Sequence, residues 1–175
     1  MQLINCGSAE TTEQQYMETI QSKTAILFEA ATQLGAVVTE QSSTVESAIA
    51  KYGLYLGTAF QLVDDILDYT ADAQAMGKNV GDDLAEGKPT LPLIHAIEKS
   101  SGEEKEILID AITNASRDNL ASVLTIIEKT QSLAYTADVA RQQVKMAQDA
   151  LSVLPDSVYK QALTDLAEFS VERTY

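Results

Sequence analysis

The chain has 175 residues, enough for one domain with a substantial core, and 45% of them are apolar. Its formal net charge is −14 and its pI is near 4.3, which argues against binding to nucleic acid or to an anionic lipid surface. A single cysteine excludes an internal disulfide and fits a reducing cytosol, and a single histidine leaves no credible zinc site. No apolar run reaches membrane-spanning length, and the first residues lack the pattern of a signal peptide. The sequence therefore predicts an acidic, cytoplasmic protein without a stable membrane anchor.

Helical patterns follow one another along the chain, and we find no convincing strand and no internal repeat. Thr12 and Gln15 have capping-box spacing at the start of the first helix, and Gly35 is its expected stop. The predicted helices span residues 12–34, 45–72, 93–99, 103–114, 118–129, 131–154 and 156–173. The fold class is therefore all-α, as one folding unit or half of one.

The segment Gly57–Asp68, GTAFQLVDDILD, holds three aspartates in the spacing D-D-x-x-D. At about 100° per residue, Asp64, Asp65 and Asp68 share one wedge of the helical wheel roughly 100° wide, and the rest of the wheel is apolar. Buried carboxylates need compensating positive charge, and no Lys or Arg lies within one turn of them. Clustered carboxylate oxygens suit Mg²⁺, which often bridges protein carboxylates to substrate phosphates. The alternative is a solvated helix face that binds no metal.

Gly53 and Gly57 lie one turn apart inside the same predicted helix, although an interior glycine costs about 1 kcal/mol relative to alanine. Either another backbone packs closely there or space is kept open for a ligand, and packing is the favoured interpretation. Residues 76–92, MGKNVGDDLAEGKPTLP, form the only long irregular stretch. Such a loop is typical of a functional flap, in which Lys78 would swing over the mouth of the site. The alternative is a simple helix connection with solvated charges.

Three segments together resemble the trans-isoprenyl diphosphate synthases: SKTAILFEAA (Ser22–Ala31), YGLYLGTAFQLVDDILDY (Tyr52–Tyr69) and GKNVGDDLAEGKPTLPLIHA (Gly77–Ala96). Within that family they are most similar to bacterial long-chain polyprenyl synthases of the octaprenyl type, which make quinone side chains. The resemblance implies an all-α bundle of the isoprenoid synthase type around a large cavity. In that fold, two D-D-x-x-D motifs and Mg²⁺ ions hold the diphosphate of an allylic substrate. Residues 1–175 would form the C-terminal part of a polyprenyl synthetase domain.

The resemblance also implies roles for individual residues. Asp64, Asp65 and Asp68 match the second aspartate-rich motif and are expected to hold the metal. The residues that match contacts to the allylic diphosphate, and that are expected to take part in catalysis, are Lys23, Thr24, Gln61 and Lys78. Phe60 matches a residue beside the pocket for isopentenyl diphosphate. The implied reaction ionises the bond to diphosphate, with metal ions and lysines stabilising the leaving group, and the isopentenyl alkene attacks the resulting cation. The glycine-rich stretch from Met76 to Gly87 would close over the site and exclude water.

The first aspartate-rich motif and the basic residues that follow it in the family are absent from this sequence. We therefore expect the isolated chain to be inactive and to self-associate through exposed apolar faces. The leading hypothesis is a prenyl-elongating transferase that makes a long-chain polyprenyl diphosphate and forms a homo-oligomer, a dimer at full length in the family. The alternatives are a non-catalytic or partner-dependent subunit of a heteromeric synthase, an acidic helical interaction module, and a terpene cyclase with related metal chemistry. Product length is set near the missing motif and does not follow from these residues.

Overall fold

The structure, a computed structural model, describes residues 6–70 and 80–172. Every regular element in these two ranges is a helix or a helical turn, so the predicted all-α class is confirmed. The chain divides into two compact units. Of the described residues, one unit contains 6–19, 64–70 and 80–137, and the other contains 20–63 and 138–172. The long helix α4 (Ser43–Thr70) supplies residues to both units.

The predicted helices are all present, with ends shifted by a few residues, and the expected ends at Asp72 and Arg173 lie outside the described residues. Besides α4, the elements in chain order are α2 (Glu13–Ile20), the π-helical turn η1 (Gln21–Ala25), α3 (Ile26–Val38), α6 (Asp82–Ala85), α7 (Leu91–Lys99), α8 (Gly102–Thr113), α9 (Leu120–Lys129), α10 (Ser132–Ala150), the 3₁₀ turn η2 (Leu151–Val153) and α11 (Val158–Glu172). No described helix is both long enough and apolar enough to cross a membrane.

The first predicted helix begins as expected but ends later. The Thr12 backbone N–H donates to Gln15 Oε1 at 2.9 Å, and the Gln15 N–H donates to Thr12 Oγ1 at 3.3 Å, which confirms the capping box. The expected stop at Gly35 is wrong, because α3 continues to Val38. Two residues after this end lies Glu40, whose φ of 53° is in the left-handed region that terminates helices.

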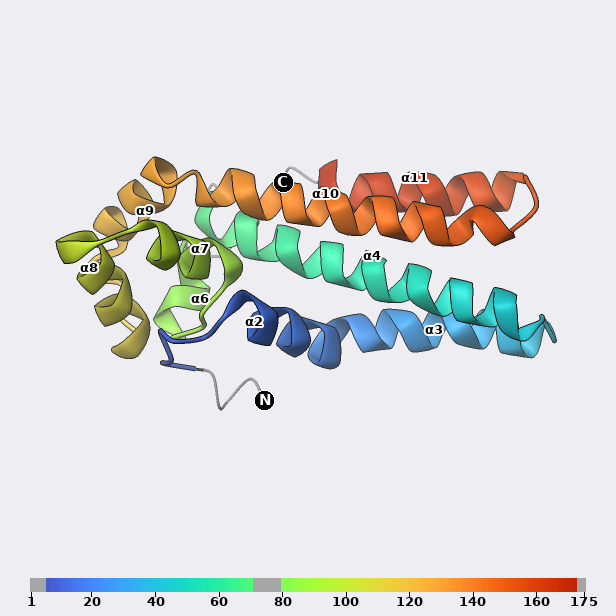
Figure 1. Ribbon diagram of the computed structural model, residues 1–175, viewed down its shortest axis with the longest axis horizontal. Coiled ribbons are helices and arrows are strands. Elements are labelled where there is room, and N and C mark those ends of the chain that lie inside the picture. Colours follow the sequence, from blue (N-terminus) through green and yellow to red (C-terminus); the bar gives the residue numbers. More distant parts are fainter. Residues whose placement is uncertain (1–5, 71–79, 173–175) are drawn as a thin grey trace. The chain divides into compact units, whose positions relative to one another are not determined.

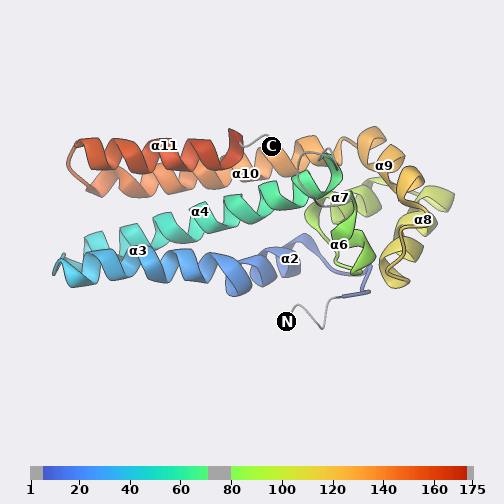
Figure 2. The ribbon, with the colours of Figure 1, turned by 180° about the vertical axis from the view of Figure 1, so that it is seen from behind.

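The second unit contains two pairs of neighbouring helices. Helix α3 lies beside the first part of α4, and α10 lies beside α11, in both views (Figures 1 and 2). A Cβ added at Gly53 of α4 would stand 2.2 Å from Thr32 Oγ1 and 2.4 Å from the Phe28 carbonyl oxygen of α3. This approach confirms that a neighbouring backbone packs against Gly53. A core cluster of this unit comes from α4, α10, η2 and α11, and its buried residues are Tyr52, Leu56, Ala59, Val144, Ala147, Leu151 and Ala167.

The first unit has its own core, which lies among the last turn of α4 and helices α6, α7, α8 and α9. Its buried residues are Tyr69, Leu84, Leu93, Ala96, Ile97, Leu108, Ala111, Ile112, Val123, Ile126 and Ile127. Tyr69 enters this core with its hydroxyl 3.1 Å from Thr90 Oγ1, so the polar end of the side chain is satisfied. This core holds the end of α4 and thereby positions the three aspartates.

Candidate active site

The three aspartates lie on α4 as the sequence predicts, on a helix that is buried on most sides. Asp65 is buried at 8% exposure, and Asp64 and Asp68 are half-buried. Apolar residues on the rest of the wheel, including Leu62 and Leu67, are buried as well. The aspartates therefore do not form an ordinary solvated face, which was the alternative interpretation.

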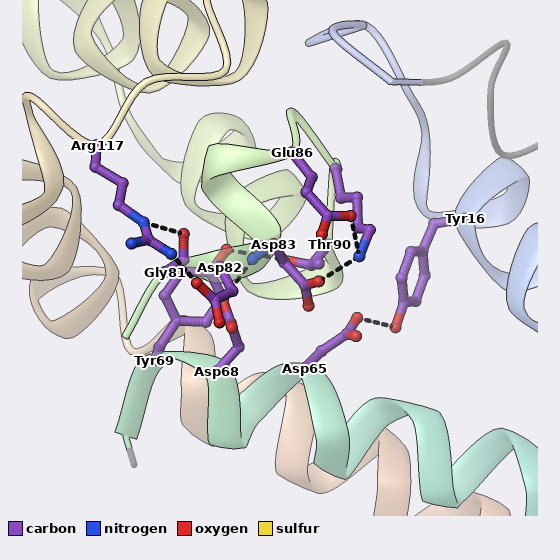
Figure 3. A network of polar contacts seen from close by, with 11 residues as sticks. Tyr16, Asp65, Asp68, Tyr69, Gly81, Asp82, Asp83, Glu86, Thr90 and Arg117 are labelled. Atoms are coloured by element: carbon purple, nitrogen blue, oxygen red, sulfur yellow. Dashed lines mark hydrogen bonds and ion pairs between the residues drawn. The ribbon is translucent and has the colours of Figure 1, made fainter. Parts of the chain in front are cut away.

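Asp65 lies against a tyrosine of α2. The Tyr16 hydroxyl donates to Asp65 Oδ2 at 2.5 Å (Figure 3). Burial, together with the charges of Asp83, Asp64 and Asp68, raises the pKa of Asp65 to about 8, although the hydrogen bond from Tyr16 acts in the opposite direction. Without a cation nearby, the Asp65 carboxyl is therefore mostly protonated at neutral pH. A bound cation would favour its ionised form.

Asp68 connects α4 to the short helix α6. The Gly81 backbone N–H donates to the Asp68 carbonyl oxygen at 2.9 Å, and the Asp83 N–H donates to Asp68 Oδ2 at 3.2 Å. Lys88 Nζ lies 2.7 Å from Asp83 Oδ1 and 2.7 Å from Glu86 Oε2. Burial lowers the pKa of Lys88, but the hydrogen bonds to Asp83 and Glu86 outweigh it, so the pKa lies above its ordinary value. The result is a group of carboxylates, among them Asp65, Asp68 and Asp83 (Figure 3), in which Asp83 is paired with the Lys88 ammonium.

The described part of the predicted flap is folded rather than free. The Arg117 side chain pairs with Asp82, and its Nε donates to the Gly81 carbonyl oxygen at 3.2 Å (Figure 3). Gly81 and Gly87 have φ angles of 79° and 66°, so both glycines are needed for left-handed turns. These contacts show that Gly81–Gly87 is folded in this conformation, and its closure over the site stays a prediction. Lys78, which was expected to swing over the site, lies outside the described residues.

The other predicted site residues lie in the second unit. Lys23 and Thr24 lie in η1, and a π-helical turn inside a longer helix frequently marks a functional site. A Cβ at Gly57 would stand 2.7 Å from Ala25 Cα, so α4 packs directly against this turn. The ring of Phe60 lies 5.8 Å from the ring of Phe28 of α3. Gln61 follows Phe60 on α4 and is half-buried, and it precedes Asp64 by one helical turn.

Four polar residues that contact the carboxylate group were not assigned to the site from the sequence: Tyr16, Asp83, Lys88 and Arg117. Asp83 and Lys88 follow the aspartate helix in a charged loop, and this pairing of opposite charges was the available signal. Tyr16 lies 49 residues from Asp65 in the sequence, and its position matches only the pattern of an apolar helix residue. No sequence pattern indicates that contact.

The donor set fits Mg²⁺ as part of a site, although it does not form a closed metal cage. Within residues 6–70 and 80–172, no three His, Cys, Asp or Glu side chains are arranged to hold a metal ion by themselves. Asp64, Asp65, Asp68 and Asp83 nevertheless offer hard oxygen donors, and the buried Asp65 receives its hydrogen bond from a neutral phenol. Mg²⁺ commonly takes only one or two carboxylates from a protein and completes its shell with water and substrate phosphates.

Known proteins with the same pattern identify the family. The sequence profile of the family named polyprenyl synthetase matches residues 1–129. The octaprenyl diphosphate synthase of Haemophilus influenzae is 50% identical over 175 residues, which cover 99% of this chain and 53% of that protein. The octaprenyl diphosphate synthase of Escherichia coli is 45% identical over 174 residues, or 99% of this chain and 54% of that protein.

A crystal structure gives the same result for the fold. The polyprenyl synthase from Caulobacter crescentus CB15, complexed with calcium and isoprenyl diphosphate, matches with a TM-score of 0.91 at 38% identity, over 98% of this chain and 53% of that chain. The fold is thus the one that polyprenyl synthases share. The chain spans about half the length of the curated relatives it matches. Because the family profile covers most of the chain and includes the D-D-x-x-D helix, the chain belongs to the polyprenyl synthetase family.

Proposed function

We propose that this chain is part of a prenyltransferase that condenses isopentenyl diphosphate with an allylic diphosphate. The observation that carries the proposal is the buried Asp65 beside Asp64, Asp68 and Asp83, a carboxylate group that needs a cation to become fully charged. The octaprenyl diphosphate synthases that are 50% and 45% identical support a long-chain polyprenyl diphosphate as the product. Use of that product for quinone side chains belongs to the same proposal.

The aspartates are proposed to hold Mg²⁺ together with the diphosphate of the allylic substrate. When bound, Mg²⁺ would neutralise charge on the departing diphosphate. Asp64 and Asp68 are half-buried on the same helix as Asp65, and are the proposed partners of Asp65 in holding it. Because burial raises the pKa of Asp65 to about 8, metal binding at neutral pH should release a proton from this carboxyl.

The remaining roles concern the two substrates. The proposed contacts to the allylic diphosphate are Lys23, Thr24, Gln61 and Lys78, and the proposed neighbour of isopentenyl diphosphate is Phe60. The π-helical turn supports the first assignment, because it departs from the regular helix at Lys23 and Thr24 and is backed by Gly57. Lysine suits a developing diphosphate charge because its ammonium stabilises negative charge directly.

We further propose that the chain needs the rest of the family fold to act, and that the complete enzyme is a cytoplasmic homo-oligomer. The acidic composition and the single exposed cysteine support that location. A partner-dependent subunit of a heteromeric synthase is the second candidate, favoured by the coverage of about half of each relative. Incorporation of isopentenyl diphosphate by the isolated chain would contradict both the need for the rest of the family fold and the partner-dependent subunit.

The test of the metal role uses the complete protein, in which this chain is joined or paired with the half of the fold that it lacks. Asp64→Ala should lower the Mg²⁺-dependent incorporation of isopentenyl diphosphate by about 10² to 10³-fold, the loss typical of one preorganised charge interaction. Asp110→Ala is the matched control, because Asp110 is an exposed aspartate on α8. Unchanged turnover in Asp64→Ala, or an equal loss in Asp110→Ala, would refute the proposed role.

A further inference from the structure

Arg117 contacts the turn at which α6 begins. It lies in the connection between α8 and α9, 36 residues after Gly81 in the sequence. Its Nε donates to the Gly81 carbonyl oxygen at 3.2 Å, and its Nη2 pairs with the Asp82 carboxylate (Figure 3). One planar guanidinium therefore holds a backbone carbonyl group and the side chain of the next residue at the same time. Two contacts from one rigid group fix an orientation, which a single hydrogen bond does not do.

The ion pair itself contributes little to the stability of the fold. The side chains of Arg117 and Asp82 are 36% and 39% exposed, and ion pairs that face water add little to the free energy of unfolding. The effect of this contact therefore lies in the placement of the backbone that it holds. That backbone leads directly into Asp83, a member of the carboxylate group.

The rest of the α8–α9 connection packs against both ends of α6. A Cβ added at Gly81 would stand 2.8 Å from Leu120 Cδ1, and a Cβ added at Gly87 would stand 3.4 Å from Ala115 Cβ. Both glycines have positive φ angles, so α6 is bounded by two left-handed turns that lie against this connection. Arg117, between Ala115 and Leu120 in the sequence, adds the polar contacts to this apolar packing.

The same turn holds Asp68 of α4. The Gly81 N–H donates to the Asp68 carbonyl oxygen at 2.9 Å, so Gly81 is bound to α4 through its N–H and to Arg117 through its carbonyl group. Two residues later, the Asp83 N–H donates to Asp68 Oδ2 at 3.2 Å (Figure 3). This bond orients the Asp68 carboxylate. It depends on the placement of the Gly81–Asp83 backbone, because hydrogen bonds weaken steeply once their geometry is lost.

We propose that Arg117 is a positioning residue for the cation that the aspartates hold. It acts through Gly81 and Asp82, which place the Asp83 N–H against the Asp68 carboxylate. Loss of a group that orients a metal ligand typically weakens metal binding by about 10- to 100-fold. Arg117 acts through one further contact, so we expect the lower end of that range. This inference rests on the proposed metal role of Asp68.

The test measures cation binding in the complete protein, in which this chain is joined or paired with the half of the fold that it lacks. The probe is Mn²⁺ with inorganic diphosphate, because Mn²⁺ takes the same oxygen ligands as Mg²⁺ and its free form is measured by electron paramagnetic resonance. Arg117→Met removes the charge and the donors, and should raise the Kd for Mn²⁺ about tenfold. Arg117→Lys keeps the charge but lacks the planar fork, and should raise the Kd at least about threefold.

Arg141→Met is the matched control, because Arg141 is an exposed arginine of α10 that also pairs with an aspartate, Asp138. It should leave the Kd within about twofold of wild type. Asp82→Ala removes the partner of Arg117 and should raise the Kd at least about threefold, and it decides the question if Arg117→Met does not fold. A wild-type Kd in Asp82→Ala, or an equal loss of binding in Arg141→Met, would overturn the proposal.

The remaining outcomes separate this inference from the proposed function. If the wild-type protein does not bind Mn²⁺ in the presence of diphosphate, the proposed metal role fails, and the positioning role fails with it. If the wild-type protein binds Mn²⁺ and Arg117→Met binds it equally well, only the positioning role is refuted, even where Arg117→Met lowers the thermal stability. A wild-type Kd in Arg117→Lys would show that charge alone is needed, which would refute the fixed orientation.

Discussion

The close approach of α4 to α3 at Gly53 makes a stability prediction with a definite sign. A Cβ added by Gly53→Ala would lie 2.4 Å from the Phe28 carbonyl oxygen, which belongs to the backbone and cannot rotate away. It would also lie 2.2 Å from Thr32 Oγ1, which is held in place by its hydrogen bond to the Ile49 carbonyl oxygen. The substitution must therefore separate the two helices or distort one of them.

Two opposing effects set the size of the change in the free energy of unfolding that Gly53→Ala causes. Alanine is favoured over glycine inside a helix by about 1 kcal/mol. Overpacking typically costs about 1–3 kcal/mol, and loss of the Thr32 hydrogen bond adds about 1 kcal/mol. We expect Gly53→Ala to lower the free energy of unfolding by about 1–3 kcal/mol. Gly35→Ala, inside α3, meets no atom within 4 Å, so only the helix preference acts, and it should raise stability by about 0.5–1 kcal/mol.

The assay is urea denaturation of the 175-residue chain and both variants, followed by circular dichroism at concentrations where the chain is monomeric. The two variants should move the midpoint in opposite directions without a large change in slope. If Gly53→Ala raises the midpoint as Gly35→Ala does, the helices do not approach closely at Gly53, and the described α3–α4 pairing is wrong.

Three further predictions concern the carboxylate group. Tyr16→Phe removes the hydrogen bond to Asp65 and should destabilise the chain by about 1–2 kcal/mol in urea; wild-type stability would contradict that bond. Because its pKa is raised, Asp65 of the folded chain keeps a proton between about pH 4 and about pH 8, whereas Asp65 of the unfolded chain has lost it. In the presence of a chelator, the stability that this proton contributes is therefore complete below about pH 4 and is lost as the pH rises through about 8. Asp65→Asn should remove this pH dependence, and an unchanged slope would show that another group causes it. Arg117→Met should speed amide hydrogen exchange in Gly81–Ala85, since it removes the contacts to Gly81 and Asp82, and unchanged exchange would mean that these contacts do not hold α6.

Patterns within one helix were predicted correctly from the sequence. The capping box at Thr12 and Gln15 and the shared wedge of Asp64, Asp65 and Asp68 depend on residues at most four positions apart. Helical geometry alone relates such residues, because each turn repeats after 3.6 residues. The family resemblance rests on the same local patterns, and they predicted that the aspartate-rich segment lies on a buried helix.

Glycines were harder to interpret, because a glycine has several uses that look alike in a sequence. Gly35 was expected to end a helix and instead lies inside one. Gly81 and Gly87 were expected in a glycine-rich stretch that closes over the site; both form left-handed turns, and the closure stays a prediction. The close packing at Gly53 was anticipated as one of two possibilities. Only the neighbouring backbone of α3 decided between them.

The composition of this chain and its helical periodicities determined an all-α fold and an acidic wedge on a buried helix. Tertiary structure alone decided how that wedge is used, because the deciding contacts join residues far apart in the chain. Burial raises the pKa of Asp65, the hydrogen bond from Tyr16, 49 residues away in the sequence, lowers it, and the neighbouring Asp83 raises it again. Likewise, the α3 sequence is apolar on several sides, and only its hydrogen bonds to α4 determine which side remains exposed.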